Sequence, residues 1–121
     1  MPHVPNIVQQ AIENDYFRRV LETGEHTQVV IMSIPPGGEI GMEVHKDNDQ
    51  VLMLVAGRGK VTLDGQESEF NTGDLVLVPA GTEHNFVTEG EGDMKIVTTY
   101  SPPHHPKGTV HKTKADADAA E

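Results

Sequence analysis

Tight-turn signals recur along this chain and separate short stretches of apolar and β-branched residues. In chain order they are PPGG at 35–38, GRG at 57–59, DG at 64–65 and NTGD at 71–74. Short strands joined by turns every 8–12 residues or so are typical of an antiparallel sandwich or barrel. We therefore expect about nine or ten short strands, the clearest at 16–23, 28–34, 50–56, 60–63, 66–70, 75–78, 84–88 and 94–100.

Two of these strands, 50–56 and 75–78, are apolar at nearly every position. Such a pattern predicts strands packed on both faces, inside two layers. Asp64-Gly65 predicts a type I′ hairpin turn, because both central residues of that turn need positive φ. Before the first strand, Asn6 is a candidate N-cap and the apolar spacing after it predicts a short helix over about 6–13.

Composition narrows the classes of function. The chain has 121 residues, the usual size of a single domain, and contains no cysteine, which excludes disulfides, iron–sulfur clusters and a cysteine nucleophile. Its formal net charge of −10 argues against nucleic acid as a partner. The first residues do not resemble a signal peptide, and no apolar stretch approaches the roughly 20 residues of a membrane helix. We expect a cytoplasmic protein that interacts with neither membranes nor nucleic acid.

Four polar residues stand where strands of such a barrel begin or end. Glu43 and His45 are two residues apart, so on an extended strand their side chains point to the same face. Gln50 follows after a polar turn, and His84 follows the turn Pro79-Ala80-Gly81. If these side chains converge, they offer two imidazoles, a carboxylate and an amide oxygen. We predict one divalent metal bound by Glu43, His45, Gln50 and His84.

The spacing of these residues resembles that of a small single-domain bacterial cupin. The first motif reads Gly37, five residues, Glu43-x-His45, four residues, Gln50, six residues and Gly57. In the family pattern a histidine takes the position of Glu43 and a glutamate that of Gln50. The second motif is matched by Gly73, Pro79, Gly81 and His84, with Thr88 in place of an asparagine. The resemblance implies an all-β jelly-roll barrel, a double-stranded β-helix, whose metal ligands are the four residues named above.

Glu43 in place of the family's histidine and Gln50 in place of its glutamate both keep a metal-binding oxygen at the ligand position. A shell of two His, one Glu and one Gln is harder than one made of histidines, which favours Mn²⁺ or Fe²⁺, with Ni²⁺ and Zn²⁺ possible. Two alternatives stay open: Glu43 can serve as a catalytic general base, and Gln50 can bind a metal-bound water instead of the metal.

Other candidate site residues are weaker. Phe86 and Tyr100 are expected in the core. Arg18 and Arg19 face opposite ways on a strand, so one of them can point inward at an anionic substrate, but a solvated strand face is expected. His104 and His105 are expected in an ordered surface arm.

We divide the chain into an N-terminal arm at 1–15, the barrel at 16–101 and an irregular tail at 102–121. Two functions remain. The first is a metal-dependent enzyme, an isomerase or a dioxygenase, that acts on a small oxygenated metabolite related to a sugar or an enol. The second is a non-catalytic module that binds a small molecule or a metal. Because open edge strands tend to pair, we also expect a homodimer.

Overall fold

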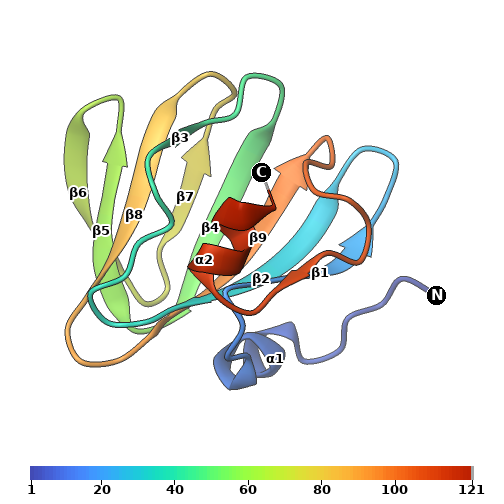
Figure 1. The fold of residues 1–121 in the computed structure, drawn as a ribbon, viewed down its shortest axis with the longest axis horizontal. Coiled ribbons are helices and arrows are strands. Elements are labelled where there is room, and N and C mark those ends of the chain that lie inside the picture. Colours follow the sequence, from blue (N-terminus) through green and yellow to red (C-terminus); the bar gives the residue numbers. More distant parts are fainter. Residues whose placement is uncertain (121) are drawn as a thin grey trace.

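The computed structural model describes residues 1–120, which form two antiparallel sheets facing each other (Figure 1). The six-stranded sheet has the order β10-β1-β2-β9-β4-β7, and the four-stranded sheet has the order β3-β8-β5-β6. The strands are β1 Arg18–Thr23, β2 Gln28–Ile34, β3 Glu43–Val44, β4 Asp49–Ala56, β5 Arg58–Leu63, β6 Gln66–Asn71, β7 Leu75–Val78, β8 Glu83–Glu89, β9 Met94–Ser101 and β10 Val110–His111. The helices are α1 Ile7–Glu13 and α2 Lys114–Ala119. The predicted all-β jelly-roll architecture is confirmed.

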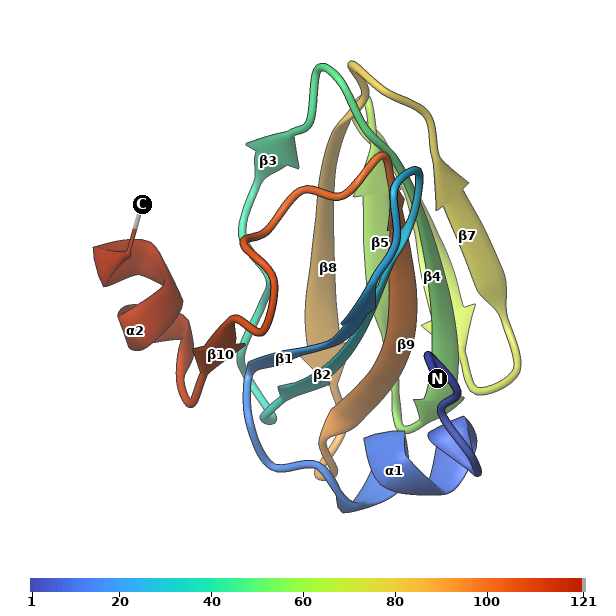
Figure 2. The same ribbon diagram turned by 90° about the vertical axis from the view of Figure 1, so that its right-hand side faces the viewer.

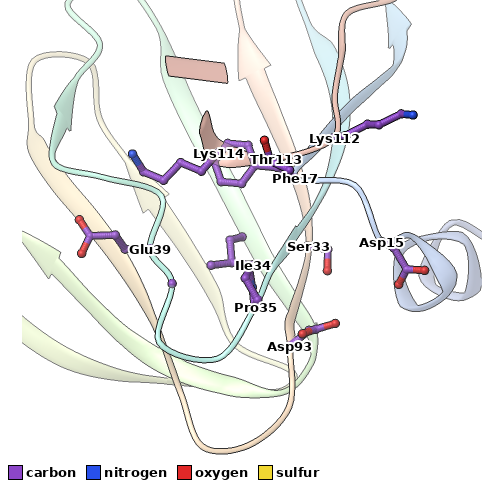
Figure 3. Close-up of a pocket in the computed structure, with 11 residues that line it drawn as sticks. Asp15, Phe17, Ser33, Ile34, Pro35, Glu39, Asp93, Lys112, Thr113 and Lys114 are labelled. Carbon is purple, nitrogen blue, oxygen red and sulfur yellow. The ribbon is translucent and has the colours of Figure 1, made fainter. Parts of the chain in front are cut away.

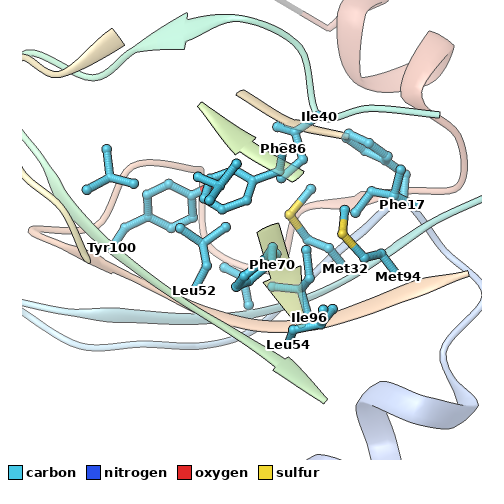
Figure 4. Close-up of a cluster of buried hydrophobic side chains, with 14 of the residues drawn as sticks. Phe17, Met32, Ile40, Leu52, Leu54, Phe70, Phe86, Met94, Ile96 and Tyr100 are labelled. Carbon is cyan, nitrogen blue, oxygen red and sulfur yellow. The ribbon is translucent and has the colours of Figure 1, made fainter. Parts of the chain in front are cut away.

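The hydrophobic core lies between the two sheets (Figure 4). Inward-facing residues of β2, β4 and β9 meet those of β5, β6 and β8. The largest are Met32, Leu52, Leu54, Phe70, Phe86, Met94, Ile96 and Tyr100, each 2% exposed or less. The predicted core position of Phe86 is therefore confirmed, and its ring lies 5.2 Å from that of Phe70.

Glycines and one aspartate shape the turns between the strands. Asp64 and Gly65 have φ values of 46° and 82°, as the predicted hairpin requires. Gly57 has a φ of 86°, and a Cβ on it would collide with the carbonyl of Asp93. Only glycine meets both conditions there, which fixes the turn between β4 and β5.

The prediction that β4 and β7 are buried on both faces is wrong. In β4 buried residues alternate with half-buried ones, and in β7 Leu75 and Leu77 are 60% and 53% exposed. The outward-facing residues of both strands lie on a face that no complete layer covers, and β7 also lies at the edge of the six-stranded sheet. Helix α1 contacts β9, β4 and β2, so it does not cover the outer face of β7.

Both chain ends contain regular elements, of which only the N-terminal helix was predicted. Helix α1 follows Asn6 as predicted, but the Asn6 side chain makes no capping bond and its φ is 51°. Helix α2 is capped by Thr113, whose hydroxyl accepts a hydrogen bond from the amide of Asp116 at 3.1 Å. Strand β10, which was not predicted, pairs with β1 and joins the C-terminal segment to the barrel (Figure 2). None of the helices in residues 1–120 has the length and apolar character needed to cross a membrane.

Candidate metal centre

The pairing of β3 with β8 brings the first and last predicted ligands together. Glu43 stands directly opposite His84 in the register of the two strands, so both side chains point to one face. The amide of Gly81 donates to the carbonyl of His45 at 2.8 Å, which holds the strand end carrying His45 against the turn before β8. Two segments almost forty residues apart in sequence therefore meet at one end of the barrel.

Glu43, His45 and His84 form a compact group of possible ligands. One ligand atom from each residue lies within 4.8 Å of the others. Oε2 of Glu43 is 3.0 Å from Nε2 of His45, yet Nε2 has no partner with hydrogen-bond geometry. About 3 Å is also the separation of two adjacent ligands that each lie about 2.1 Å from a shared ion at right angles. The pair is therefore spaced as neighbouring ligands would be.

His84 is held in the tautomer that metal binding needs. Its Nδ1 lies 2.9 Å from the carbonyl oxygen of Thr82. Because a carbonyl can only accept, Nδ1 carries the proton and Nε2 presents its lone pair. Nε2 is buried and has no hydrogen-bond partner. Burial lowers the pKa of His84 and so favours the neutral ring. The hydrogen bond to the Thr82 carbonyl acts in the opposite direction but is the smaller effect.

Gln50 approaches from the other sheet. In β4 it stands opposite Tyr100 of β9 and is 2% exposed. Its Nε2 donates to the hydroxyl of Thr98 at 3.1 Å, while its Oε1 is buried without a partner. The Tyr100 phenol interacts with Gln50, and the Tyr100 ring lies 5.7 Å from that of His45. An unpaired amide oxygen at this end of the barrel suits a fourth ligand, and the role of Gln50 stays a prediction.

The charge of Glu43 fits the same role. Burial raises the pKa of this carboxyl group, but His45, with smaller effects from Arg18 and His84, lowers it more, so the net pKa lies below the ordinary value. The carboxylate is therefore ionised at neutral pH. One carboxylate, two imidazole nitrogens and an amide oxygen form a donor set that divalent transition metals accept.

The tail histidines lie in an ordered segment at the surface, as the sequence suggested, and this segment also reaches the candidate centre. The ring of His104 lies 4.3 Å from that of His45, and its Nδ1 is 3.2 Å from Oδ1 of Asn48. A cavity of about 380 Å³ opens at the centre and is lined by Glu43, Val44, His45 and His104. His104 was missed because nothing in the local sequence shows where the tail returns.

Arg18 also differs from the expectation of a solvated strand face. Its residue surface is 3% exposed, and its guanidinium points into the barrel, where it interacts with Tyr100. Its neighbour Arg19 is exposed, as strand alternation requires. Burial raises the pKa of Tyr100 to about 12 despite the nearby Arg18, so the phenol is neutral.

A separate cavity of about 310 Å³ lies elsewhere, between the N-terminal segment, β2 and the start of α2 (Figure 3). Phe17, Ile34 and Pro35 form its apolar wall, and the charged side chains at its rim carry both signs. None of the predicted ligands lines it. The candidate centre is therefore confined to the end of the barrel where β3 meets β8.

The comparison with family models decides the relationship. The model of the Cupin domain family matches residues 30–100, which include both motifs. This chain is a cupin. A crystal structure of BH2720 from Bacillus halodurans superposes with a TM-score of 0.96 at 42% identity, covering 98% of this chain and 95% of that one.

Two sequence relatives extend this result. The Bacillus subtilis protein YrkC, described as uncharacterized, is 43% identical to this cupin over an alignment of 126 positions that covers 99% of this chain and 68% of YrkC. Quercetin 2,3-dioxygenase of the same organism is 33% identical over 64 residues, which are 53% of this chain and 19% of that enzyme. The resemblance inferred from the motif spacing is thus confirmed at the level of the family.

Proposed function

We propose that this cupin is a metal-dependent enzyme that acts on a small oxygenated metabolite, either sugar-like or enol-like. The observation that carries the proposal is the set of buried polar atoms at the end of the barrel. Nε2 of His84 and Oε1 of Gln50 have no hydrogen-bond partner, and Nε2 of His45 lies 3.0 Å from the ionised carboxylate of Glu43. Buried polar atoms are rarely left unpaired without a functional reason.

In this proposal Glu43, His45 and His84 hold one divalent ion and Gln50 completes the shell. The oxygen donors favour Mn²⁺ or Fe²⁺, with Ni²⁺ and Zn²⁺ possible. When bound, such an ion polarises substrate oxygens as a Lewis acid, and iron adds redox chemistry.

The residues of the chain have separate duties around that ion. The Thr82 carbonyl keeps the His84 ring oriented. Glu43, ionised and facing the cavity of about 380 Å³, can accept a proton from a substrate bound there. A ligand and a general base can be the same carboxylate when it binds the ion through one oxygen only.

The type of reaction is an isomerisation or an oxygen-dependent cleavage. Similarity to a stretch of quercetin 2,3-dioxygenase supports the second type, although that stretch is a small part of the enzyme. We further propose a cytoplasmic homodimer. The exposed Leu75 and Leu77 on the edge strand β7 support self-association, and a sequence without cysteine suits a reducing compartment.

Turnover by the metal-loaded protein tests the enzyme proposal. A panel of hydroxyketones, enols and sugar acids would be incubated with the protein, with oxygen uptake followed by an electrode and products by NMR. We expect a reaction in the wild type and in His26→Ala, an exposed control, and none in His84→Ala. Equal turnover in His84→Ala would contradict the proposal, and tight metal binding without turnover of any compound would favour the binding module.

A further inference from the structure

We propose that Arg18 and the C-terminal histidine segment form a carboxylate-binding subsite next to the metal centre, so that the substrate is a small carboxylate with a second oxygen function. The part of this inference that concerns the substrate rests on the proposed function. The subsite itself follows from the surroundings of Arg18.

Arg18 is a buried charge that has no carboxylate in direct contact; the ionised Glu43 interacts with it only electrostatically. Arg18 is 3% exposed, its Nη1 lies 3.1 Å from Nδ1 of His111, and its Nε is buried with no partner. Within residues 1–120 no carboxylate lies at ion-pair distance from Arg18. A guanidinium does not lose its proton in proteins, so burial cannot make it neutral. A buried charge without a contacting partner is strongly destabilising. The guanidinium, and its Nε in particular, therefore has room for an anion in direct contact.

A cavity beside Arg18 has the size to hold one. Its volume is about 390 Å³, and Arg18, His104, His105, Thr109 and His111 contribute to its lining. That is within the range of small-molecule sites. The cavity at the metal centre, with Glu43 and His45, is also lined by His104. Because His104 borders both cavities, one ligand can lie along its ring, with an oxygen at the metal centre and an anionic group at Arg18.

The charges around Arg18 favour a carboxylate over a phosphate. Burial, helped by the charge of Arg18, lowers the pKa of His105 to about 3, so this ring is neutral. The guanidinium supplies a single permanent positive charge, which balances a carboxylate, whereas a phosphate monoester carries about −1.5 to −2. The fork of an arginine also matches the two oxygens of a carboxylate.

NMR of the arginine Nε–H groups tests the subsite without relying on activity. The other arginines, Arg19 and Arg58, are exposed, so Arg19→Lys and Arg58→Lys assign the Arg18 signal by elimination. Acetate and glycolate would be titrated into metal-free and metal-loaded protein. Ethylene glycol serves as the neutral analogue and inorganic phosphate as the competing anion. Metal content is measured in every sample.

We expect saturable movement of the Arg18 signal with acetate and glycolate and none with ethylene glycol. Glycolate binding should weaken roughly tenfold or more in Arg18→Gln and recover only partly in Arg18→Lys, because an ammonium lacks the fork. Arg19→Gln should bind glycolate like the wild type.

An unmoved Arg18 signal, or equal glycolate affinity in a folded Arg18→Gln protein, would overturn the subsite. Stronger movement with phosphate than with carboxylates would overturn the carboxylate assignment. If Arg18→Gln does not fold, the wild-type titration decides alone. A wild type that takes up no metal but binds acetate at Arg18 would refute the proposed metalloenzyme and leave the subsite standing.

Discussion

Replacing Gln50 by methionine should make the metal-free protein more stable while weakening its metal site. Methionine has nearly the same length as glutamine and fills a core position well. The change removes the buried Oε1, which has no partner, and one hydrogen bond from Nε2 to Thr98 at 3.1 Å. The Thr98 hydroxyl remains satisfied, because it donates to the carbonyl of Val51 at 2.7 Å.

The size of the effect follows from these two terms. Relief of an unpaired buried acceptor is worth about 1–3 kcal/mol, and loss of a neutral hydrogen bond costs about 0.5–1.5 kcal/mol. We therefore expect the free energy of unfolding of Gln50→Met to rise by about 1 kcal/mol in the absence of metal. With metal present the sign should reverse, because the variant gains less from binding.

Gln28 provides a matched control, since it is equally buried but fully paired. Its Nε2 donates to the Thr23 hydroxyl at 3.0 Å and to the His105 carbonyl at 2.7 Å. Its Oε1 accepts from the amides of His104 at 3.2 Å and His105 at 3.0 Å. Gln28→Met leaves these buried partner groups without their hydrogen bonds and should destabilise the protein by about 3 kcal/mol or more.

Urea unfolding in a chelator, followed by circular dichroism at neutral pH, compares the two variants. Repeating the wild type and Gln50→Met with saturating Mn²⁺ measures the metal-dependent difference. A Gln50→Met protein that loses about 1 kcal/mol or more without metal would show that Oε1 is well satisfied in the folded state. The interpretation of Oε1 of Gln50 as an unpaired metal ligand would then be refuted.

Three further predictions concern the rest of the barrel. Lys95 is buried and donates to the Asn14 carbonyl at 2.6 Å and the Ser33 hydroxyl at 3.0 Å. Lys95→Met should therefore lower the free energy of unfolding by about 1–3 kcal/mol in urea titrations. A change as small as that of Lys107→Met, at an exposed position, would contradict this. Burial holds the pKa of His105 in the folded protein at about 3 instead of 6.5. As the pH falls below 6.5, the unfolded chain protonates this imidazole before the folded protein does. Acidification should therefore destabilise the wild type more than His105→Gln. Because His105 is partly exposed, the difference in the free energy of unfolding should change by less than about 1.4 kcal/mol per pH unit. Parallel profiles of unfolding free energy against pH for the two proteins would contradict this prediction. Leu77→Glu should yield a monomer by light scattering where the wild type gives a dimer, and an unchanged mass would argue against β7 as the contact.

The fold and most of the centre could be predicted because turn residues and strand alternation are local signals. Glycine at position 57 and Asp-Gly at 64–65 satisfy backbone conformations that few other residues tolerate. The two-residue spacing of Glu43 and His45 sets a shared face whatever surrounds it. These constraints act within a few residues, so they are visible in sequence.

What the sequence could not supply depends on distant parts of the chain. Around Arg18 the strand carries apolar residues on both faces, so alternation did not show which arginine turns inward. The place of His104 follows from hydrogen bonds to Gln28, which is 76 residues away. The exposure of Leu77 reflects the edge position of β7, which only the order of strands reveals.

Metal content tests the central claim most directly. The protein would be purified without added metal as wild type, His45→Ala, His84→Ala and the exposed control His26→Ala, with circular dichroism to verify folding. We predict about one equivalent of Mn, Fe, Ni or Zn per chain in the wild type and the control, and its loss in folded His45→Ala and His84→Ala. A folded wild type that contains no metal and takes up none when it is added would contradict the metal centre formed by Glu43, His45, Gln50 and His84.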